Sequence, residues 1–282
     1  MIKWTSDPHL TAIGPSEGLP LTRLGPTERR SRVSASAITA LVIATALLVF
    51  PAAVVSAATD DAEPATTTDY AVLVRGELFS DDLAEAQPVH DAVAAGGEEA
   101  ARAAGDFYHL AALSTPLLGG AEGSFLGVDR WSDPQNIEAF YSDPAFAEAF
   151  GALFPSAPTI ELFERRTDWH SWGDLPDTAS GEIRWIAAVR GQLAQTDPAA
   201  AQQAHDAVAS GAQASSMAAG DIAHVAYTGL GDPAQFLAFD VWESDENIEA
   251  VYGDPAFQAA FAPLFASPPT LVVYRSTDWH QW

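Results

Sequence analysis

The chain has 282 residues, of which 48% are hydrophobic, and this is enough length and apolar content to bury a core. It carries 38 acidic and 13 basic residues, for a net charge of −25, and such a surface argues against a nucleic-acid partner because it repels phosphate backbones. It has no cysteine, so the sequence excludes disulfides, thiolate nucleophiles and cysteine-ligated metals.

The N-terminal part of the chain has the pattern of a targeting segment. Arg29, Arg30 and Arg32 precede an uncharged apolar run at residues 33–58 that ends in "VVSAA". This order predicts a signal peptide cleaved after Ala57 or Ala58; the alternative is an uncleaved membrane anchor, because the run approaches the ~20 residues that span a bilayer. Either segment would place the rest of the chain outside the cytoplasm, as a periplasmic, extracellular or outward-facing anchored protein. Residues 1–32 are an N-terminal extension in which residues 1–28 have no signal character, as expected if the start codon is assigned too far upstream. Residues 59–69 are predicted to be a polar linker.

The remainder of the chain is a duplication. "VRGEL" at 74–78 recurs as "VRGQL" at 189–193, "HDAVAAG" as "HDAVASG", and "TDWHSW" at 167–172 as "TDWHQW" at 277–282. Order, spacing and identity agree over about 100 residues, as expected of two copies of one structural unit. The repeats are predicted at 70–172 and 183–282, joined by a linker at 173–182.

Each repeat has the pattern strand, helix, two strands, helix, strand. In the first repeat we expect a strand at 70–78, a helix from Asp82 to a left-handed cap at Gly105, a strand pair ending at 131, and a strand at 159–167. Short helices are predicted after N-caps at Ser132 and Ser244 and, with proline in the first turn, after Asp143 and Asp254. A sheet in the order 4-1-3-2, covered by helices on one side, leaves an apolar face that needs a partner. The predicted fold class is therefore α+β: two tandem ferredoxin-like βαββαβ units that pair within the chain as a pseudo-dimeric α+β barrel, preceded by the signal or anchor helix.

One stretch of each repeat resembles a known family. Asp240 to Phe261, which reads D-x-W-x-S-x-E-N-I-E-A-x-Y-x-D-P-A-F-x-x-A-F, and its sister Asp129 to Phe150 resemble the third strand and second helix of antibiotic biosynthesis monooxygenase-like domains, in the dimeric α+β barrel superfamily. Members of this family include cofactor-free oxygenases that act on polycyclic phenols, haem-degrading enzymes, small isomerases and proteins with no known activity. The resemblance therefore implies one of these classes for this chain. Haem-degrading members use an Asn in the first strand and a Trp and a His in the second helix. The corresponding positions here hold Val74 or Arg75, then Tyr141 and Phe150, so we expect no haem and no other cofactor.

Polar residues retained in both repeats inside apolar surroundings are the candidates for chemistry. Side chains two apart on a strand share a face, so an Arg, an Asp and a His from neighbouring strands can meet. The candidate catalytic residues are Arg75, His90, His109 and Asp129 in the first repeat, and Arg190, His205, His224 and Asp240 in the second. In the functional interpretation His is a general base for a phenol or enol, Arg stabilises the oxyanion and Asp orients one of them.

Two alternatives to this functional interpretation stay open for these residues. They could form a buried Arg–Asp pair with a His hydrogen bond that only stabilises the sheet. They could also ligate zinc or iron, but no His-x-x-x-His or similar tight spacing occurs, so no metal site is predicted.

The repeated tails at 167–172 and 277–282 are expected to pack across onto the partner sheet as clasps, with His170 and His280 outside the chemistry.

Two functions remain open at this point. The first is a cofactor-independent monooxygenase-like or isomerase-like enzyme that acts on a small aromatic or enolic compound in a cavity between sheet and helices. The second is a non-catalytic module of the same fold that binds a small ligand or another molecule. The chain has no nucleophile elbow, phosphate loop or dinucleotide fingerprint, which argues against those enzyme classes.

Overall fold

The computed structural model describes residues 68–282. The predicted N-terminal extension, the signal or anchor segment and almost all of the first linker lie outside the described residues. Among residues 68–282, no helix is both long enough and apolar enough to cross a membrane.

The first repeat contains four strands and three helices in the predicted order. Helix α1 begins after the N-cap Asp82 and ends at Gly105, whose φ of 106° is the left-handed cap that the sequence predicts. The elements are β1 (Tyr70–Gly76), α1 (Leu83–Ala104), β2 (Asp106–Ser114), β3 (Phe125–Trp131), α2 (Pro134–Tyr141), α3 (Pro144–Gly151) and β4 (Thr159–Arg165).

The second repeat follows the same order. Asp254 caps α6 and Pro255 occupies its first turn, as Asp143 and Pro144 do in α3, and both caps were predicted. The elements are β5 (Trp185–Gln192), α4 (Pro198–Ala218), β6 (Asp221–Gly229), β7 (Gln235–Trp242), α5 (Ile248–Gly253), α6 (Pro255–Phe261) and β8 (Thr270–Ser276).

Two local predictions were wrong. The cap of α2 is Asp133, which accepts a hydrogen bond from the Gln135 amide, whereas the Ser132 hydroxyl donates to the carbonyl of Gly105. Helix α5 begins only after Asn247, three residues beyond Ser244. At α2 a carboxylate nearer to the first turn thus takes the place of the serine, and at α5 the N-cap Asn247 makes no side-chain cap hydrogen bond.

The strands form a closed barrel in the order β1-β3-β2-β8-β5-β7-β6-β4. Within each repeat this is the predicted order 4-1-3-2. The two four-stranded halves join through β2 with β8 and β4 with β6, and every pairing is antiparallel. The α+β class is confirmed.

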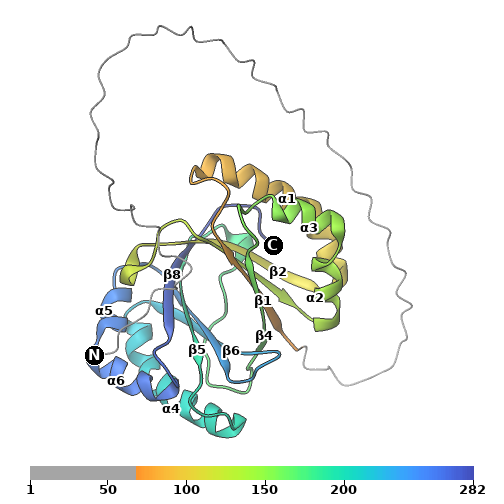
Figure 1. The fold of residues 1–282 in the computed structure, drawn as a ribbon. Helices are drawn as coiled ribbons and strands as arrows, with labels where there is room; N and C mark the ends of the chain where they lie inside the picture. Colours follow the sequence, from red (N-terminus) through yellow and green to blue (C-terminus); the bar gives the residue numbers. More distant parts are fainter. Residues whose placement is uncertain (1–67) are drawn as a thin grey trace, which may run out of the picture. The chain divides into compact units, whose positions relative to one another are not determined.

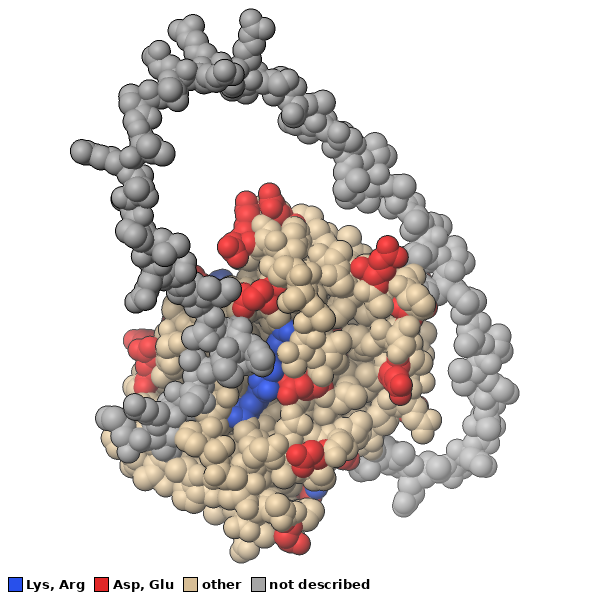
Figure 2. All heavy atoms as spheres, viewed as in Figure 1, with Lys and Arg blue, Asp and Glu red and all other residues tan. Residues whose placement is uncertain are grey.

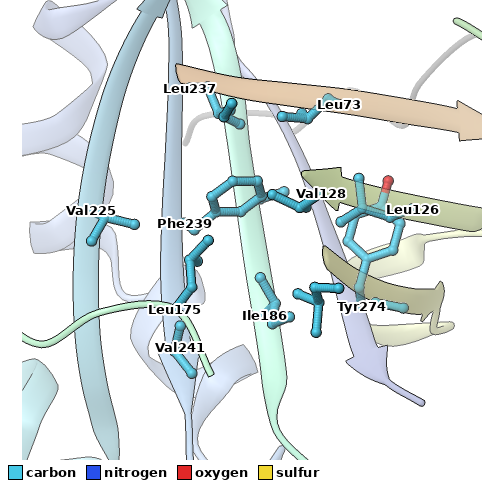
Figure 3. Packing of buried hydrophobic residues seen from close by; sticks show 14 of the residues in the cluster. Leu73, Leu126, Val128, Leu175, Ile186, Val225, Leu237, Phe239, Val241 and Tyr274 are labelled. Atoms are coloured by element: carbon cyan, nitrogen blue, oxygen red, sulfur yellow. The ribbon is translucent and has the colours of Figure 1, made fainter. Parts of the chain in front are cut away.

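The barrel interior is packed with side chains from strands of both repeats. Figure 3 shows Leu73, Leu126, Ile186 and Phe239 pointing toward one another inside the barrel. These residues are buried completely, so side chains fill this part of the barrel interior as a core.

The outer face of each half is covered by its own helices. Helices α1 to α3 lie over the first half and α4 to α6 over the second (Figure 1). Each half therefore has a second core, between sheet and helices, that is separate from the barrel interior. Acidic side chains are scattered over the face drawn in Figure 2, and the few basic ones in view lie mostly in one stripe.

Candidate functional site

Strand parity brings a polar cluster into the layer between sheet and helices. On β2 and β3, His109 and Asp129 are paired across the strands, and Asp129 shares its face with the buried Trp131. His90 of α1 is buried, with 2% of its surface exposed, and its ring stacks on that of His109 with centroids 5.4 Å apart. The helix and the two strands thus supply one side chain each.

These side chains form a row of polar contacts, which we call the relay, at what we call the first site. The His109 Nδ1–H donates to Asp129 Oδ1 at 2.5 Å, and the other oxygen of Asp129 accepts from the Tyr141 hydroxyl of α2. The two Nε2 atoms of His109 and His90 face each other at 3.4 Å. Beyond them, His90 Nδ1–H donates to Asp91 Oδ1 at 3.1 Å.

The second repeat repeats this relay atom for atom, and we call it the second site. His224 donates to Asp240 at 2.5 Å, Tyr252 donates to the other oxygen of Asp240, and the two Nε2 atoms of His224 and His205 are 3.0 Å apart. His205 in turn donates to Asp206 at 3.0 Å.

The relay has room for one proton at its centre. Because a carboxylate only accepts hydrogen bonds, the Nδ1 atoms that face Asp91 and Asp129 both carry hydrogen. Two lone pairs then meet between the Nε2 atoms, and one added proton would bind both of them. Burial and the neighbouring His109 lower the pKa of His90 to about 4, so above that pH His90 is neutral and its Nε2 lone pair is free to accept a proton. His205 has its pKa lowered to about 4 by the same causes.

A second carboxyl group, Asp106 in the first site and Asp221 in the second, lies beside each relay and is protonated, hence neutral, below about pH 9. Burial and, next, the charge of Asp129 raise the pKa of Asp106 to about 9, and burial with Asp240 does the same for Asp221. Each carboxyl accepts a backbone hydrogen bond at the bulge that begins its strand, Asp106 from the Tyr108 amide at 3.1 Å. A neutral carboxylic acid can donate to an anion, and it is a candidate for that task here.

A small cavity adjoins each relay. Each has about 40 Å³ of space, which is room for a few water-sized groups. The walls are mostly aromatic and aliphatic, and in the first site His90, His109, Asp106, Asp129 and Tyr141 are among the lining residues. A few convergent polar groups in an otherwise apolar pocket are typical of a ligand site.

The tails that end each repeat also reach these sites, from the opposite half. The first tail (residues 167–172) follows β4 and bonds to β6, and the second tail (residues 277–282) follows β8 and bonds to β2. The predicted packing across onto the partner sheet is therefore observed. The clasp interpretation missed that Trp282 and Trp172 also line the first and second cavities.

Arg75 and Arg190 are not part of either relay. Arg75 alternates with Val74 on β1 and shares the side of Ala71 and Leu73, which point into the barrel. It bonds Glu161 of β4 at 2.9 Å, and Arg190 bonds the other oxygen of Glu161 at 3.0 Å. The predicted meeting of Arg, Asp and His on one face is wrong for arginine because strand alternation sends it to the opposite face.

Several residues of the sites were missed by sequence reasoning. Tyr141 and Tyr252 on the short helices, and Asp106 and Asp221 at the starts of β2 and β6, were not among the candidate residues. Both pairs are retained in the two repeats, the aspartates within "AAGD", and that shared retention was the available signal. Among residues 68–282, no group of three or more His, Asp or Glu side chains has the geometry to hold a metal ion.

Gly173 holds the first tail against β6. Its φ is +61°, and a Cβ at this position would lie 2.6 Å from the Ala223 Cβ and closer still to the Ile222 carbonyl oxygen. We expect Gly173→Ala to lower the free energy of unfolding by about 1–3 kcal/mol, measured by urea titration, from the strained backbone and the clash. The control is Gly181→Ala, at φ +67° with nothing within 4 Å, which has only the backbone cost. Equal losses in the two variants would contradict the predicted contact.

Comparison with known proteins agrees with the predicted resemblance. Residues 188–263, within the second repeat, match the family described as Antibiotic biosynthesis monooxygenase. No curated protein matches the chain. Among solved structures, an "anthrone oxidase-like protein" is 17% identical with a TM-score of 0.53, over 76% of this chain and 92% of that one. A "putative monooxygenase" from Fusobacterium nucleatum is 6% identical with a TM-score of 0.53, over 77% and 98%. At these identities the two structures show a shared fold alone.

Proposed function

We propose that this monooxygenase-like α+β barrel protein is a cofactor-independent enzyme that removes a proton from a small aromatic or enolic compound, once in each repeat. The observation that supports the proposal most is the His90–His109–Asp129–Tyr141 relay beside an apolar cavity, with its copy in the second repeat. A buried histidine pair held by carboxylates at both ends is suited to take up one proton and return it.

The reaction would begin with transfer of the acidic hydrogen of the substrate to the gap between the two Nε2 atoms. The positive charge that forms there is stabilised by Asp91 and Asp129, and the negative charge on the substrate by the neutral Asp106. In the oxygenase form of the proposal, dioxygen oxidises the anion: one oxygen atom enters the product and the other leaves as water. In the isomerase form, the proton returns to a different carbon.

Entry of a ring-sized substrate requires the cavity to widen from about 40 Å³. In the first site the cover is α3, in which no side chain is fully buried, so it can shift at small cost. The substrate class that we propose is a phenol or anthrone-like ring, in keeping with the name of one structure of the same fold.

We also propose an organisation for the whole chain. The two repeats are the halves of an intrachain pseudo-dimer, which the β2–β8 and β4–β6 pairings support. The protein is exported through, or anchored by, residues 33–58, and with a net charge of −25 it takes no nucleic acid.

The test is turnover of a panel of hydroquinones and anthrones, followed by absorbance with and without dioxygen. The wild type should consume at least one of them in a dioxygen-dependent way, or isomerise an enolic substrate without dioxygen. The double variant His109→Gln, His224→Gln should lose at least 100-fold in rate, the scale of a general base. Turnover that persists in the double variant, or no turnover by the wild type, would count against the enzyme.

The second candidate is a non-catalytic small-ligand-binding or interaction module. It is favoured by the same relay, because the hydrogen bonds of Asp129 to the His109 ring and the Tyr141 hydroxyl could serve only to hold α2 to the sheet. Saturable binding of a panel compound, without any chemical change over hours, would select this function over the enzyme.

A further inference from the structure

The two tails make contacts with the relays that a simple clasp would not need. In the second tail, the His109 amide donates to the Trp282 carbonyl at 2.7 Å, and the Trp282 indole stacks on the His109 ring with centroids 4.5 Å apart. The Trp279 ring lies 5.0 Å from that of His90. Both histidines of the first site are thus covered by aromatic rings from the second repeat.

The first tail makes the matching contacts in the second site. The Trp172 ring stacks on His224 with centroids 4.8 Å apart, and the Trp169 ring lies 4.8 Å from that of His205. The His224 amide donates to the Trp172 carbonyl at 2.8 Å. The exchange of tails between the halves is therefore reciprocal.

A backbone amide of each tail also holds the outer end of the relay. The His280 amide donates to Asp91 Oδ1 at 2.7 Å, and this oxygen is the acceptor for His90 Nδ1–H. In the second site the His170 amide donates to Asp206 Oδ1 at 2.7 Å, the acceptor for His205. A carboxylate fixed in this way fixes which imidazole nitrogen carries the hydrogen, and hence that the Nε2 atom is the one left to accept a proton.

We propose that each tail is a positioning element for the site of the other repeat, so that both sites are composite and neither repeat completes its own. The tail orients the imidazole pair by stacking and sets the tautomer of its outer histidine through the Asp91 or Asp206 carboxylate. As a statement about catalysis this rests on the proposed function, whereas as a statement about tautomers it does not.

The test uses the full chain and the imidazole nitrogen signals of ¹⁵N-labelled protein, since a nitrogen that bears hydrogen and one that does not have well-separated shifts. Trp282→Ala should move the signals of His90 and His109 and leave those of His205 and His224 in place. Trp172→Ala, its matched control, should do the reverse. Trp282→Phe, which keeps a ring for stacking, should restore most of the wild-type pattern and remains informative if the alanine variant does not fold.

A second pair of variants separates the amide from the side chain. His280→Ala keeps the amide that bonds Asp91 and loses the side-chain contacts to Glu98 and to the Trp282 ring, whereas His280→Pro loses the amide as well. Only the proline variant should change the His90 tautomer.

With a panel substrate that the wild type converts, Trp282→Ala and Trp172→Ala should each lose about half of the turnover per chain. The variant that carries both substitutions should lose nearly all of it. Signals of both histidine pairs moving together in either tryptophan variant, or of neither pair, would overturn the proposal. If the wild type has no activity but the signals change site by site, the proposed function fails and the composite sites stand.

Discussion

Replacement of Asp129 by alanine should lower the free energy of unfolding by about 2–6 kcal/mol, because it leaves two buried donors unpaired at about 1–3 kcal/mol each. Asp129 is only 6% exposed and serves two donors at once, the His109 ring and the Tyr141 hydroxyl. Without the carboxylate, both donors remain in a layer that water does not reach freely. Urea unfolding at pH 7 measures the loss.

Two further substitutions, one in the second site and one on the surface, test whether the loss is specific to the relay. Asp240→Ala should cost a similar amount, because the second site repeats the same contacts. Asp168→Ala is the control: its side chain is 55% exposed and bonds only Arg166, so we expect a change within about 0.5 kcal/mol. A cost below about 1 kcal/mol for Asp129→Ala would mean that the relay is not what holds α2 to the sheet.

The isosteric change Asp129→Asn separates a structural role from a chemical one. Asparagine keeps an acceptor for one of the two donors but has no charge to balance the histidine pair. If the relay is a site, the variant folds and loses turnover or binding in the first repeat. If it is only structural, the loss appears in stability and no ligand property changes.

The fold could be predicted from the sequence because duplication doubles every signal. Asp82 and Gly105 mark the ends of α1, and the βαββαβ order of elements predicts a ferredoxin-like sheet with the order 4-1-3-2, since these depend on local chemistry and on short connections. His109 and Asp129 could be named as neighbours on the same grounds, before the register that pairs them was known.

What could not be predicted depends on long-range register. Whether Arg75 faces the helices or the barrel interior is decided by a shift of one residue, and its partner Glu161 lies 86 positions away. The stacking of Trp282 on His109 likewise depends on how the two halves close into a barrel. For this reason the tails were interpreted as clasps and their place in the sites was missed.

Stability should fall as the pH rises from about 6.5 to 9, and the cause is the pair of neutral carboxyl groups. The pKa of Asp106 and of Asp221 is about 9 in the folded protein against 3.8 for the ordinary group, so between these values the folded state binds more protons than the unfolded state. Stability is then fully present below pH 3.8 and is lost as the pH rises through 9, at up to about 1.4 kcal/mol per pH unit for each group.

At lower pH the histidines act in the opposite direction. His90 and His205 have pKa values of about 4 in the folded protein against 6.5 for the ordinary group, so the unfolded state binds more protons between pH 6.5 and 4, and stability falls as the pH falls. Over this interval the two histidines make stability rise with pH, and the two aspartates make it fall by a similar amount. The wild type should therefore change little in stability between pH 4 and 6.5 from these four groups.

The double variant Asp106→Asn, Asp221→Asn tests both parts at once, because an amide imitates the neutral acid and does not titrate. Above pH 7 the variant should lose the decline and be more stable than the wild type at pH 8.5. Below pH 6.5 the effect of the histidines is no longer offset, so stability should now fall toward pH 4. Urea unfolding at pH 4.5, 6.5 and 8.5 measures both slopes, with Asp168→Asn as an exposed control that should follow the wild type. A decline above pH 7 that survives in the double variant would show that Asp106 and Asp221 are ionised in the folded protein, and the neutral acid would then be removed from the proposed mechanism.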